Sequence, residues 1–339
     1  MNIVFDIMHP AHINFFKNSM YSLKNAGHNV FVTVLKRGKL PKIVESELDG
    51  FNIKIIGQHK GTKSSIIFDA NLFRFLKMFS YLRKIKPDVG VSVGSFILGA
   101  NLKILNKPNY QFDDDPERSV NVFLEKLTST KLFFPNIYFS NSSKVELVNT
   151  LKEWAYLSPK YFRPNKSILY KYKLKPFEYI FVREISTGSL NYSTQQSNII
   201  ASFSDQFPKG TNVLFSLENK ENSSLYPNDW ILLKEPVSDI HSLIFFSKLL
   251  ISSGDSMARE GALLGVPSIY CGNRTMRANK LLEEKKVLFH QQIGIPNKIK
   301  EICDSDVLID NRNNFRNVLY DEWIDINEFI VELVKKSEY

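Results

Sequence analysis

Apolar strands alternate with amphipathic helices along the first half of the chain. β-Branched and aromatic residues fill 2–7 and 30–35, and between them 14–25 carries apolar residues at helical spacing and ends before Gly27. A helix that links two strands of one sheet crosses over in the right-handed sense, so we expect the strands to be parallel. The same pattern predicts further elements in this half: strands at 52–56 and 88–93, a helix at 71–86, and a strand running into a turn at 110–115.

The pattern weakens over 146–175 and then restarts. Prolines at 159, 164 and 176 interrupt this stretch, so we expect an interdomain linker at 166–176. A chain of 339 residues is long enough for two domains. We therefore predict two doubly wound, Rossmann-like α/β domains, at 1–165 and 177–322, facing a cleft at the carboxyl ends of their strands. Beyond the linker the pattern predicts strands at 179–182, 212–216 and 249–251, helices at 195–207 and 240–247, and a C-terminal helix within 323–339.

A polar turn at 252–254 and a short helix follow the apolar strand at 249–251. The start of that helix presents backbone N–H groups to which a phosphate can bind. Glu260 lies about one and a half turns into the helix, where its carboxylate can accept hydrogen bonds from paired sugar hydroxyls. Gly265 and Pro267 end the helix and begin the next strand.

This spacing resembles the nucleotide-sugar site of GT-B glycosyltransferases. It is similar to that of the enzyme that adds N-acetylglucosamine to the peptidoglycan lipid precursor, and to that of the non-hydrolysing UDP-N-acetylglucosamine 2-epimerases. Ser253-Gly254, Glu260 and Gly265-Val266-Pro267 match the pattern. The resemblance implies a GT-B fold, a diphosphate held by the Ser-Gly turn, a ribose bound by Glu260, and a last helix that crosses back to the first domain. An ordinary strand, turn and helix of an α/β protein is the alternative.

Further polar residues of the second domain are candidates for binding the same ligand. Three arginines follow strands or lie in the loops beyond them, where guanidinium groups can make bidentate contacts to a diphosphate. Asp255 could cap the helix, and a carboxylate there competes with phosphate for the same N–H groups. We expect a UDP-sugar as the donor substrate, with no other cofactor and no metal. The expected binding residues are Arg183, Ser252, Ser253, Gly254, Asp255, Ser256, Glu260, Arg274 and Arg277.

Two histidines follow the first strand, where open α/β sheets place ligands. His12 lies near the start of the next helix, and a helix N-terminus lowers the pKa of an imidazole, which keeps a general base neutral. His9 and His12 could instead cap or pack, or bind a metal, although Pro10 separates them and the sequence holds no further Cys/His cluster.

The run Asp113-Asp114-Asp115-Pro116-Glu117 is a dense acidic site in a basic half of the chain. Neighbouring like charges raise some carboxylate pKa values, as a general acid or base requires. A solvated loop with a helix-capping acid and a metal site are the alternatives. We predict that the catalytic residues are drawn from His12, Asp113, Asp114 and Glu117.

The opening of the chain also resembles an uncharacterised bacterial and archaeal family, a domain of unknown function placed near the GT-B transferases and epimerases. The similar residues are Asp-Ile-Met-His-Pro-Ala-His-Ile-Asn-Phe-Phe-Lys at 6–17, Phe112-Asp113-Asp114 and the turn and helix that begin at Ser252. The resemblance covers both halves of the chain and implies no particular activity.

Charge is distributed unevenly along the chain. Residues 1–170 carry 24 Lys and Arg against 13 Asp and Glu, whereas 171–339 carry 20 against 22. A basic half fits an anionic lipid leaflet, a lipid-diphosphate acceptor or nucleic acid, and a Lys-rich genome would give the same bias. The sequence shows no nucleic-acid recognition helix or stacking motif, so we expect no nucleic acid. Oligomeric state stays open.

Two cysteines, no signal-peptide pattern and no apolar run of roughly 18 residues favour a cytoplasmic protein. We expect a peripheral contact with the inner face of the cytoplasmic membrane.

We expect a GT-B glycosyltransferase that moves a sugar from a nucleotide-diphosphate sugar to a cell-surface glycan or lipid-linked acceptor, as in bacterial capsule or other polysaccharide biosynthesis. A UDP-sugar 2-epimerase is the alternative, because Arg183-Glu184 resembles an Arg-Glu pair of the epimerases. However, Phe181 stands in the place of their catalytic His, and Arg118 in that of a second Glu. A non-catalytic nucleotide- or glycan-binding module is the third hypothesis.

Overall fold

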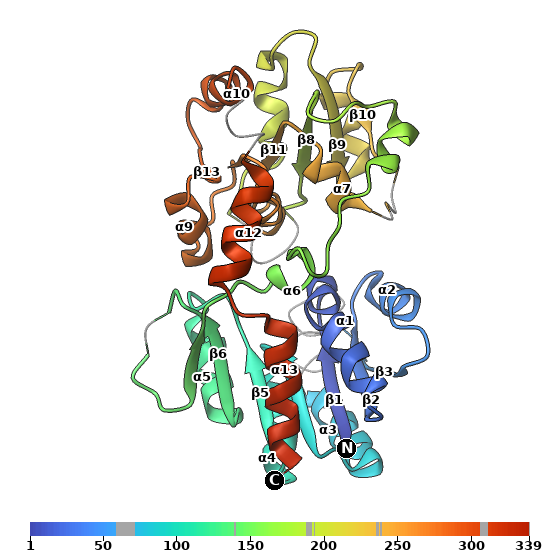
Figure 1. Ribbon diagram of the computed structural model, residues 1–339. Helices are drawn as coiled ribbons and strands as arrows, with labels where there is room; N and C mark the ends of the chain where they lie inside the picture. The colour runs from blue at the N-terminus through green and yellow to red at the C-terminus, as the bar shows by residue number, and fades with distance from the viewer. Residues whose placement is uncertain are drawn as a thin grey trace. The chain divides into compact units, whose positions relative to one another are not determined.

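The computed structural model describes residues 1–58, 72–138, 140–187, 192, 194–234, 237, 239–305 and 311–338. The chain divides into two compact units: unit 1 is Met1–Tyr156 with Trp323–Tyr339, and unit 2 is Leu157–Glu322 (Figure 1). Each unit is built on its own parallel sheet with helices around it. The prediction of two Rossmann-like α/β domains is therefore confirmed.

The chain passes from unit 1 to unit 2 after Tyr156, which is before the linker expected at 166–176. The segment expected to be a linker lies within unit 2. Lys166–Tyr172 forms a 3₁₀ helix, η2, whose Leu169 is buried. Just before it, the Asn165 N–H donates to the Ser242 hydroxyl oxygen at 2.9 Å. The prolines that break the periodicity thus belong to a segment that is packed on unit 2.

The sheet of unit 1 has the strand order β3-β2-β1-β4-β5-β6-β7. All its pairings are parallel, as the crossover rule requires. The order reverses between β1 and β4, and open α/β sheets bind ligands at the carboxyl ends of strands beside such a point. The strands are β1 (Asn2–Ile7), β2 (Asn29–Lys36), β3 (Asn52–Gln58), β4 (Val89–Val93), β5 (Asn109–Phe112), β6 (Lys131–Pro135) and β7 (Val145–Val148).

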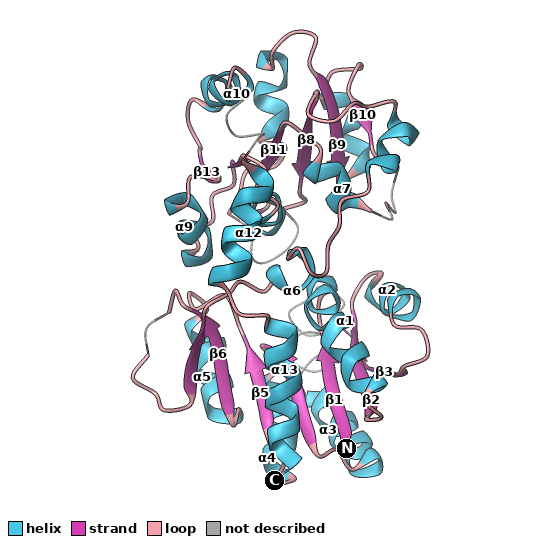
Figure 2. Ribbon diagram, in the orientation of Figure 1, coloured by secondary structure: helices cyan, strands magenta, loops and turns pink. Residues whose placement is uncertain are grey.

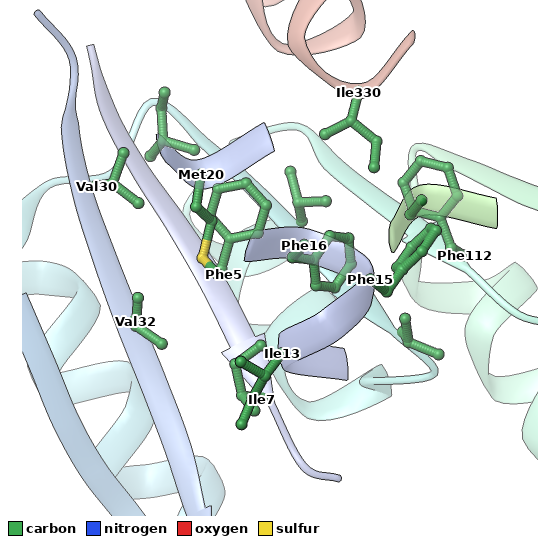
Figure 3. Packing of buried hydrophobic residues seen from close by; sticks show 14 of the residues in the cluster. Phe5, Ile7, Ile13, Phe15, Phe16, Met20, Val30, Val32, Phe112 and Ile330 are labelled. Atoms are coloured by element: carbon green, nitrogen blue, oxygen red, sulfur yellow. The ribbon is translucent and has the colours of Figure 1, made fainter. Parts of the chain in front are cut away.

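Helices cover both faces of this sheet (Figure 2). On one face the apolar sides of α1 and α13 are buried in one core, which contains Phe5, Phe16 and Ile330 (Figure 3). On the other face α3 and α4 bury Met78 and Leu98. The predicted helix at 71–86 corresponds to α3, and residue 71 lies outside the described residues. The helices are α1 (Pro10–Asn25), α2 (Leu40–Glu47), α3 (Arg74–Ile85), α4 (Phe96–Ile104), α5 (Ser119–Thr128), α6 (Trp154–Leu157), α13 (Ile326–Lys335) and the 3₁₀ helix η6 (Lys336–Glu338).

The last helix, α13, belongs to unit 1 although it follows unit 2 in sequence. Ile326, Ile330 and Val334 recur every four residues and are buried in the core that α1 also joins. Asn327 Nδ2 donates to the Ala155 carbonyl oxygen at 2.7 Å. Apolar burial and this hydrogen bond together hold the C-terminal segment on unit 1.

A buried ion pair joins β1 to α3 in unit 1. Arg74 Nη2 lies 2.6 Å from Asp6 Oδ1, and the two side chains are 1% and 0% exposed. Thr33 and Ser95 also donate to the Asp6 carboxylate, at 2.7 and 2.5 Å. A charge buried this deeply is tolerated because hydrogen bonds satisfy its oxygens.

The sheet of unit 2 has the order β10-β9-β8-β11-β12-β13 and is also parallel. The helix expected at 195–207 is instead a shorter 3₁₀ helix, η4, interrupted at Phe203 by a non-helical backbone conformation. The strands are β8 (Tyr179–Glu184), β9 (Asn212–Leu217), β10 (Ile231–Leu232), β11 (Leu249–Ser252), β12 (Ser268–Tyr270) and β13 (Leu288–His290). The helices, with η2, are η4 (Ile200–Gln206), η5 (Lys220–Leu225), α7 (Ile240–Phe245), α8 (Asp255–Leu263), α9 (Arg277–Glu284), α10 (Ile295–Cys303) and α12 (Arg312–Glu322).

Candidate functional site

The turn between β11 and α8 in unit 2 is held together by buried hydroxyl groups. The Ser252 hydroxyl donates to the Gly254 carbonyl oxygen at 2.7 Å and accepts from the Gly254 N–H at 3.1 Å. The Ser253 hydroxyl oxygen accepts from the Ile185 N–H at 2.9 Å. Because both serine side chains are fully buried, their hydroxyls fix the turn from inside rather than extend into solvent.

Helix α8 begins without a side-chain cap. Gly254 occupies the N-cap position, and the Ala258 N–H donates to its carbonyl oxygen at 3.3 Å. The N–H groups of Ser256 and Met257 therefore precede the first N–H that donates within the helix, and Ser256 is exposed. Outward-pointing N–H groups and the positive end of the helix dipole allow this end of α8 to bind an anion.

Gly254 and not Asp255 is the N-cap of α8, and Asp255 occupies the first helical position. Asp255 Oδ2 lies 3.0 Å from Arg259 Nη1 and 3.7 Å from Arg274 Nη1. The Tyr192 hydroxyl donates to Oδ1. One carboxylate between two guanidinium groups leaves a net positive charge beside the start of α8, and the Arg274 side chain is 20% exposed.

Arg259 is a residue of this cluster that the sequence analysis missed. It is buried, and its Nη1 also lies 3.2 Å from Asn279 Oδ1. The only sequence signal was its position four residues after Asp255, a spacing at which opposite charges meet on a helix. That spacing does not say whether the pair is buried.

The two other predicted arginines lie on other elements of unit 2. Arg183, at the end of β8, donates to the Ser216 hydroxyl oxygen at 2.6 Å and to Glu218 Oε1 at 2.8 Å. Arg277 is exposed at the first position of α9. Arg274 lies beside the start of α8, where its Nη1 is 3.7 Å from Asp255 Oδ2.

Glu260 lies on the same helix, 3.5 Å from the Nε2 atom of His241 on α7. Their side chains are 13% and 20% exposed, so both reach the surface of unit 2. A carboxylate beside an imidazole can both accept and donate hydrogen bonds, which suits a pair of ribose hydroxyls. The sequence analysis missed His241 because the two residues come from different helices.

In unit 1, His9 and His12 lie where β1 passes into α1. His9 is the N-cap of α1, and its Nδ1 accepts from the Ala11 N–H at 3.2 Å. Desolvation and then the charge of Lys152 lower the pKa of His9 to about 4. Burial is also the main cause that lowers the pKa of His12 well below its usual value. Both imidazoles are therefore neutral at pH 7, as a general base must be.

The fold places the residues of the acidic run after β5 in different environments. Asp113 and Asp114 line a pocket with Phe15, Phe112 and Phe133, and Asp114 lies 2.7 Å from Lys152 Nζ. Burial and the charge of Asp114 raise the pKa of Asp113. Glu117, in contrast, is exposed at the start of the helical segment. The structure thus brings two of the four predicted catalytic residues into one pocket, near the end of β5.

Glu125 is a further acidic residue of this region that the sequence analysis missed. It lies on α5, and its side chain is completely buried beside Asp113. Its only sequence signal is a single Glu among the apolar residues of an amphipathic helix, a position that normally faces solvent.

Among the described residues, no group of three or more His, Cys, Asp or Glu side chains is arranged to hold a metal ion. Within the same residues, no helix combines the length and the apolar character needed to cross a bilayer.

Counted by unit, the charge asymmetry is smaller than between the two halves of the sequence: unit 1 carries 23 basic and 17 acidic residues, and unit 2 carries 21 and 18. The difference arises because the basic segment 157–170 belongs to unit 2 and the acidic C-terminal segment belongs to unit 1.

Comparison with known proteins places the chain among uncharacterised relatives with a known fold. A family model described as a protein of unknown function, DUF354, matches residues 1–128 and 138–338. An uncharacterised protein of Methanocaldococcus jannaschii is 23% identical over 324 residues, which cover 90% of each chain. The glycosyltransferase VinC, solved in complex with DTDP, is similar in structure with a TM-score of 0.69, 12% identity and 100% of both chains covered. The UDP-GlcNAc 2-epimerase from M. jannaschii gives a TM-score of 0.68 and 16% identity over 99% of this chain and 100% of that one.

At such identities the two solved structures show the fold alone. The predicted resemblance to GT-B enzymes and to an uncharacterised family near them is confirmed. The reaction and the acceptor have to be argued from the residues of this chain.

Proposed function

The chain belongs to the DUF354 family of proteins of unknown function, and we propose that it is a glycosyltransferase that moves a sugar from a nucleotide-diphosphate sugar to a glycan or lipid-linked acceptor. The observation that carries the proposal is the start of α8. There the N-terminal end of the helix is joined by two pairs, in which Asp255 and Glu260 of α8 meet Arg274 and His241 from other elements of unit 2. Together they offer donors for phosphates and partners for sugar hydroxyls.

In this proposal unit 2 binds the donor. The diphosphate takes the N–H groups of Ser256 and Met257 and the guanidinium of Arg274, which Asp255 orients. Glu260 and His241 take the ribose hydroxyls. A UDP-sugar is the proposed donor, since the similar solved structures are named for DTDP and UDP-GlcNAc. The same helix end and arginine would stabilise the diphosphate as it leaves.

Unit 1 supplies the acceptor side. It has a small pocket between the buried rings of Phe15, Phe112 and Phe133 and the carboxyl groups of Asp113 and Asp114. A carboxylate at this pocket can take the proton of an attacking hydroxyl. The base of the proposed reaction comes from this pocket or from the neutral His12.

The proposal is tested first by nucleotide binding. Isothermal calorimetry with UDP, dTDP and UDP-sugars should give a saturable signal, and Glu260→Ala should weaken it by about 1–3 kcal/mol, the cost of hydrogen bonds lost at a charged group. Glu284→Ala is a matched control, because Glu284 is exposed on the neighbouring helix α9. If the Glu260→Ala and Glu284→Ala proteins bind every nucleotide with equal affinity, the assignment of the donor site to α8 is refuted.

A UDP-sugar 2-epimerase is the second candidate, because a similar solved structure has that name. Two observations argue against it. Phe181, which stands in the place of the epimerases' catalytic His, is completely buried in β8. Glu184 is engaged inside unit 2, where it accepts from the Ile200 N–H at 2.8 Å and the Tyr226 hydroxyl at 3.0 Å. NMR of UDP-GlcNAc incubated without acceptor separates the two, since only an epimerase inverts C2.

We also propose that the protein is cytoplasmic and contacts an anionic membrane surface peripherally through unit 1. Helix α5 exposes Val120, Phe123 and Leu127, which are 70%, 66% and 51% exposed and follow one side of the helix. Exposed apolar side chains on a unit with excess positive charge suit an anionic lipid surface.

A further inference from the structure

Helix α5 brings the carboxyl group of Glu125 against the acidic turn of unit 1. Glu125 is 0% exposed and lies on the side of α5 that also buries Val122. Gly94, at the end of β4, adopts φ +61°, and a Cβ atom there would lie 3.2 Å from Glu125 Oε1. The carboxyl group therefore sits close against the ends of the strands, where the pocket of unit 1 opens.

No donor among the residues that the structure describes reaches either carboxyl oxygen of Glu125. Its side-chain partner is another carboxyl group, that of Asp113. Two carboxylates in hydrogen-bond contact and out of water repel each other strongly, and sharing one proton turns this repulsion into a hydrogen bond. The geometry thus requires a proton on the pair.

The charges around the pair favour Glu125 as the residue that holds this proton. Asp113 and Asp115 of the turn face it with negative charge, and Arg118 at the start of α5 opposes them. Burial, the charge of Asp113 and the shared hydrogen bond raise the pKa of Glu125 well above its usual range. Asp113 also accepts from the Asp115 N–H at 3.0 Å, which favours its ionised form.

We propose that Glu125 is a positioning residue that donates its proton to Asp113 and thereby keeps Asp113 available as the base for an acceptor hydroxyl bound in the pocket. This inference rests on the proposed transferase function and names the base within it. Asp114 is already paired with Lys152 at 2.7 Å, so its carboxylate is held by a cation, whereas Asp113 is held by a neutral acid. A carboxylate bound to a neutral donor is the better proton acceptor.

The step balances within the proposed reaction. The acceptor O–H bond breaks and its proton goes to Asp113, while the oxygen forms a bond to the anomeric carbon of the sugar. The bond from that carbon to the phosphate oxygen breaks, and its electron pair leaves with the nucleoside diphosphate. Glu125 keeps its own proton throughout, and Asp113 afterwards returns the acquired proton to water.

Two substitutions separate this role from a structural one. Glu125→Gln keeps the shape and a neutral N–H donor for Asp113, whereas Glu125→Leu removes the donor. Loss of the donor destabilises the Asp113 carboxylate and raises its pKa, so the acid limb of the transfer rate against pH should move up by about one unit or more in Glu125→Leu. In Glu125→Gln the acid limb of the transfer rate should lie at the same pH as in the unchanged protein.

Infrared spectroscopy of the full-length protein without any substrate provides a readout independent of activity. The unchanged protein should show a protonated carboxyl band at pH 8 that is missing in both Glu125 variants, and Glu146→Gln, at a half-exposed carboxyl on β7, should keep the band. Circular dichroism checks that each variant is folded.

Absence of the band in the unchanged protein would overturn the shared proton whatever the activity. If the band is present but Glu125→Gln slows transfer as much as Glu125→Leu with the acid limb unmoved, the positioning role is refuted. Failure of every nucleotide to bind would instead refute the transferase, and with it the assignment of Asp113 as base, while the band would still decide whether the pair shares a proton.

Discussion

The buried Glu125 makes the stability of unit 1 depend on pH in a way that one substitution should abolish. In the unfolded chain a Glu titrates with a pKa of about 4.3, whereas burial beside Asp113 raises the folded-state pKa of Glu125 well above this value. Between the two pKa values the native state binds one more proton than the unfolded state. Stability therefore falls as pH rises through this range.

The magnitude follows from that single proton. Each pH unit within the range costs the native state about 1.4 kcal/mol. Between pH 7 and pH 8 the unchanged protein should lose about 1.4 kcal/mol more than Glu125→Gln, which has no proton to release. The lowered pKa values of His9 and His12 affect both proteins equally, so the contribution of these two residues cancels in the difference.

Urea unfolding followed by tryptophan fluorescence measures the difference. Trp154 and Trp323 both lie in unit 1 with ring centroids 5.5 Å apart, and the third tryptophan, Trp230, lies in unit 2. A Trp230→Phe background therefore makes the signal report on unit 1. If the stability difference between the unchanged protein and Glu125→Gln is the same at pH 7 and pH 8, Glu125 is already ionised at pH 7 and the reasoning fails.

The remaining predictions concern the ion pair, the base and the membrane. Arg74→Met should destabilise unit 1 by about 3–5 kcal/mol, because it leaves the Asp6 carboxylate buried without its cation; a loss below about 1 kcal/mol in urea unfolding would contradict this. Asp113→Asn should lower single-turnover transfer by about 10²–10⁴-fold with calorimetric nucleotide affinity nearly unchanged, and a larger loss in His12→Ala would move the base to α1. Phe123→Ser should weaken sedimentation with anionic vesicles, and binding should fall as salt rises; equal binding to neutral vesicles at low salt would refute the surface.

Much of the architecture follows from local sequence patterns. The alternation of apolar strands with amphipathic helices predicts parallel α/β units, because each period depends only on neighbouring residues. The turn at Ser252–Gly254 and the helix after it are likewise encoded locally. The helix expected at 195–207 was wrong in type and length, since η4 starts later and breaks at Phe203.

The linker expected at 166–176 shows that local sequence patterns do not predict how an irregular segment packs. Weak periodicity and prolines indicate a break in regular structure, but they do not indicate whether the segment packs. Leu169 is buried in unit 2, and that burial depends on surfaces contributed by distant parts of the chain. The C-terminal helix shows the reverse case: its spacing predicts one buried face, and only the fold decides that this face packs in unit 1.

The sequence by itself determined which residue types stand at the ends of the strands, and hence the candidates Asp113, Asp114, Arg274 and Glu260. Only the tertiary structure decided their partners. It turned Asp255 from a potential cap into the anchor of two arginines, left Glu117 in solvent, and buried Glu125 against Asp113. The physical reason is that the pKa and the role of an ionisable group depend on the charges and the water within a few ångströms of it, and those neighbours come from elements far apart in sequence.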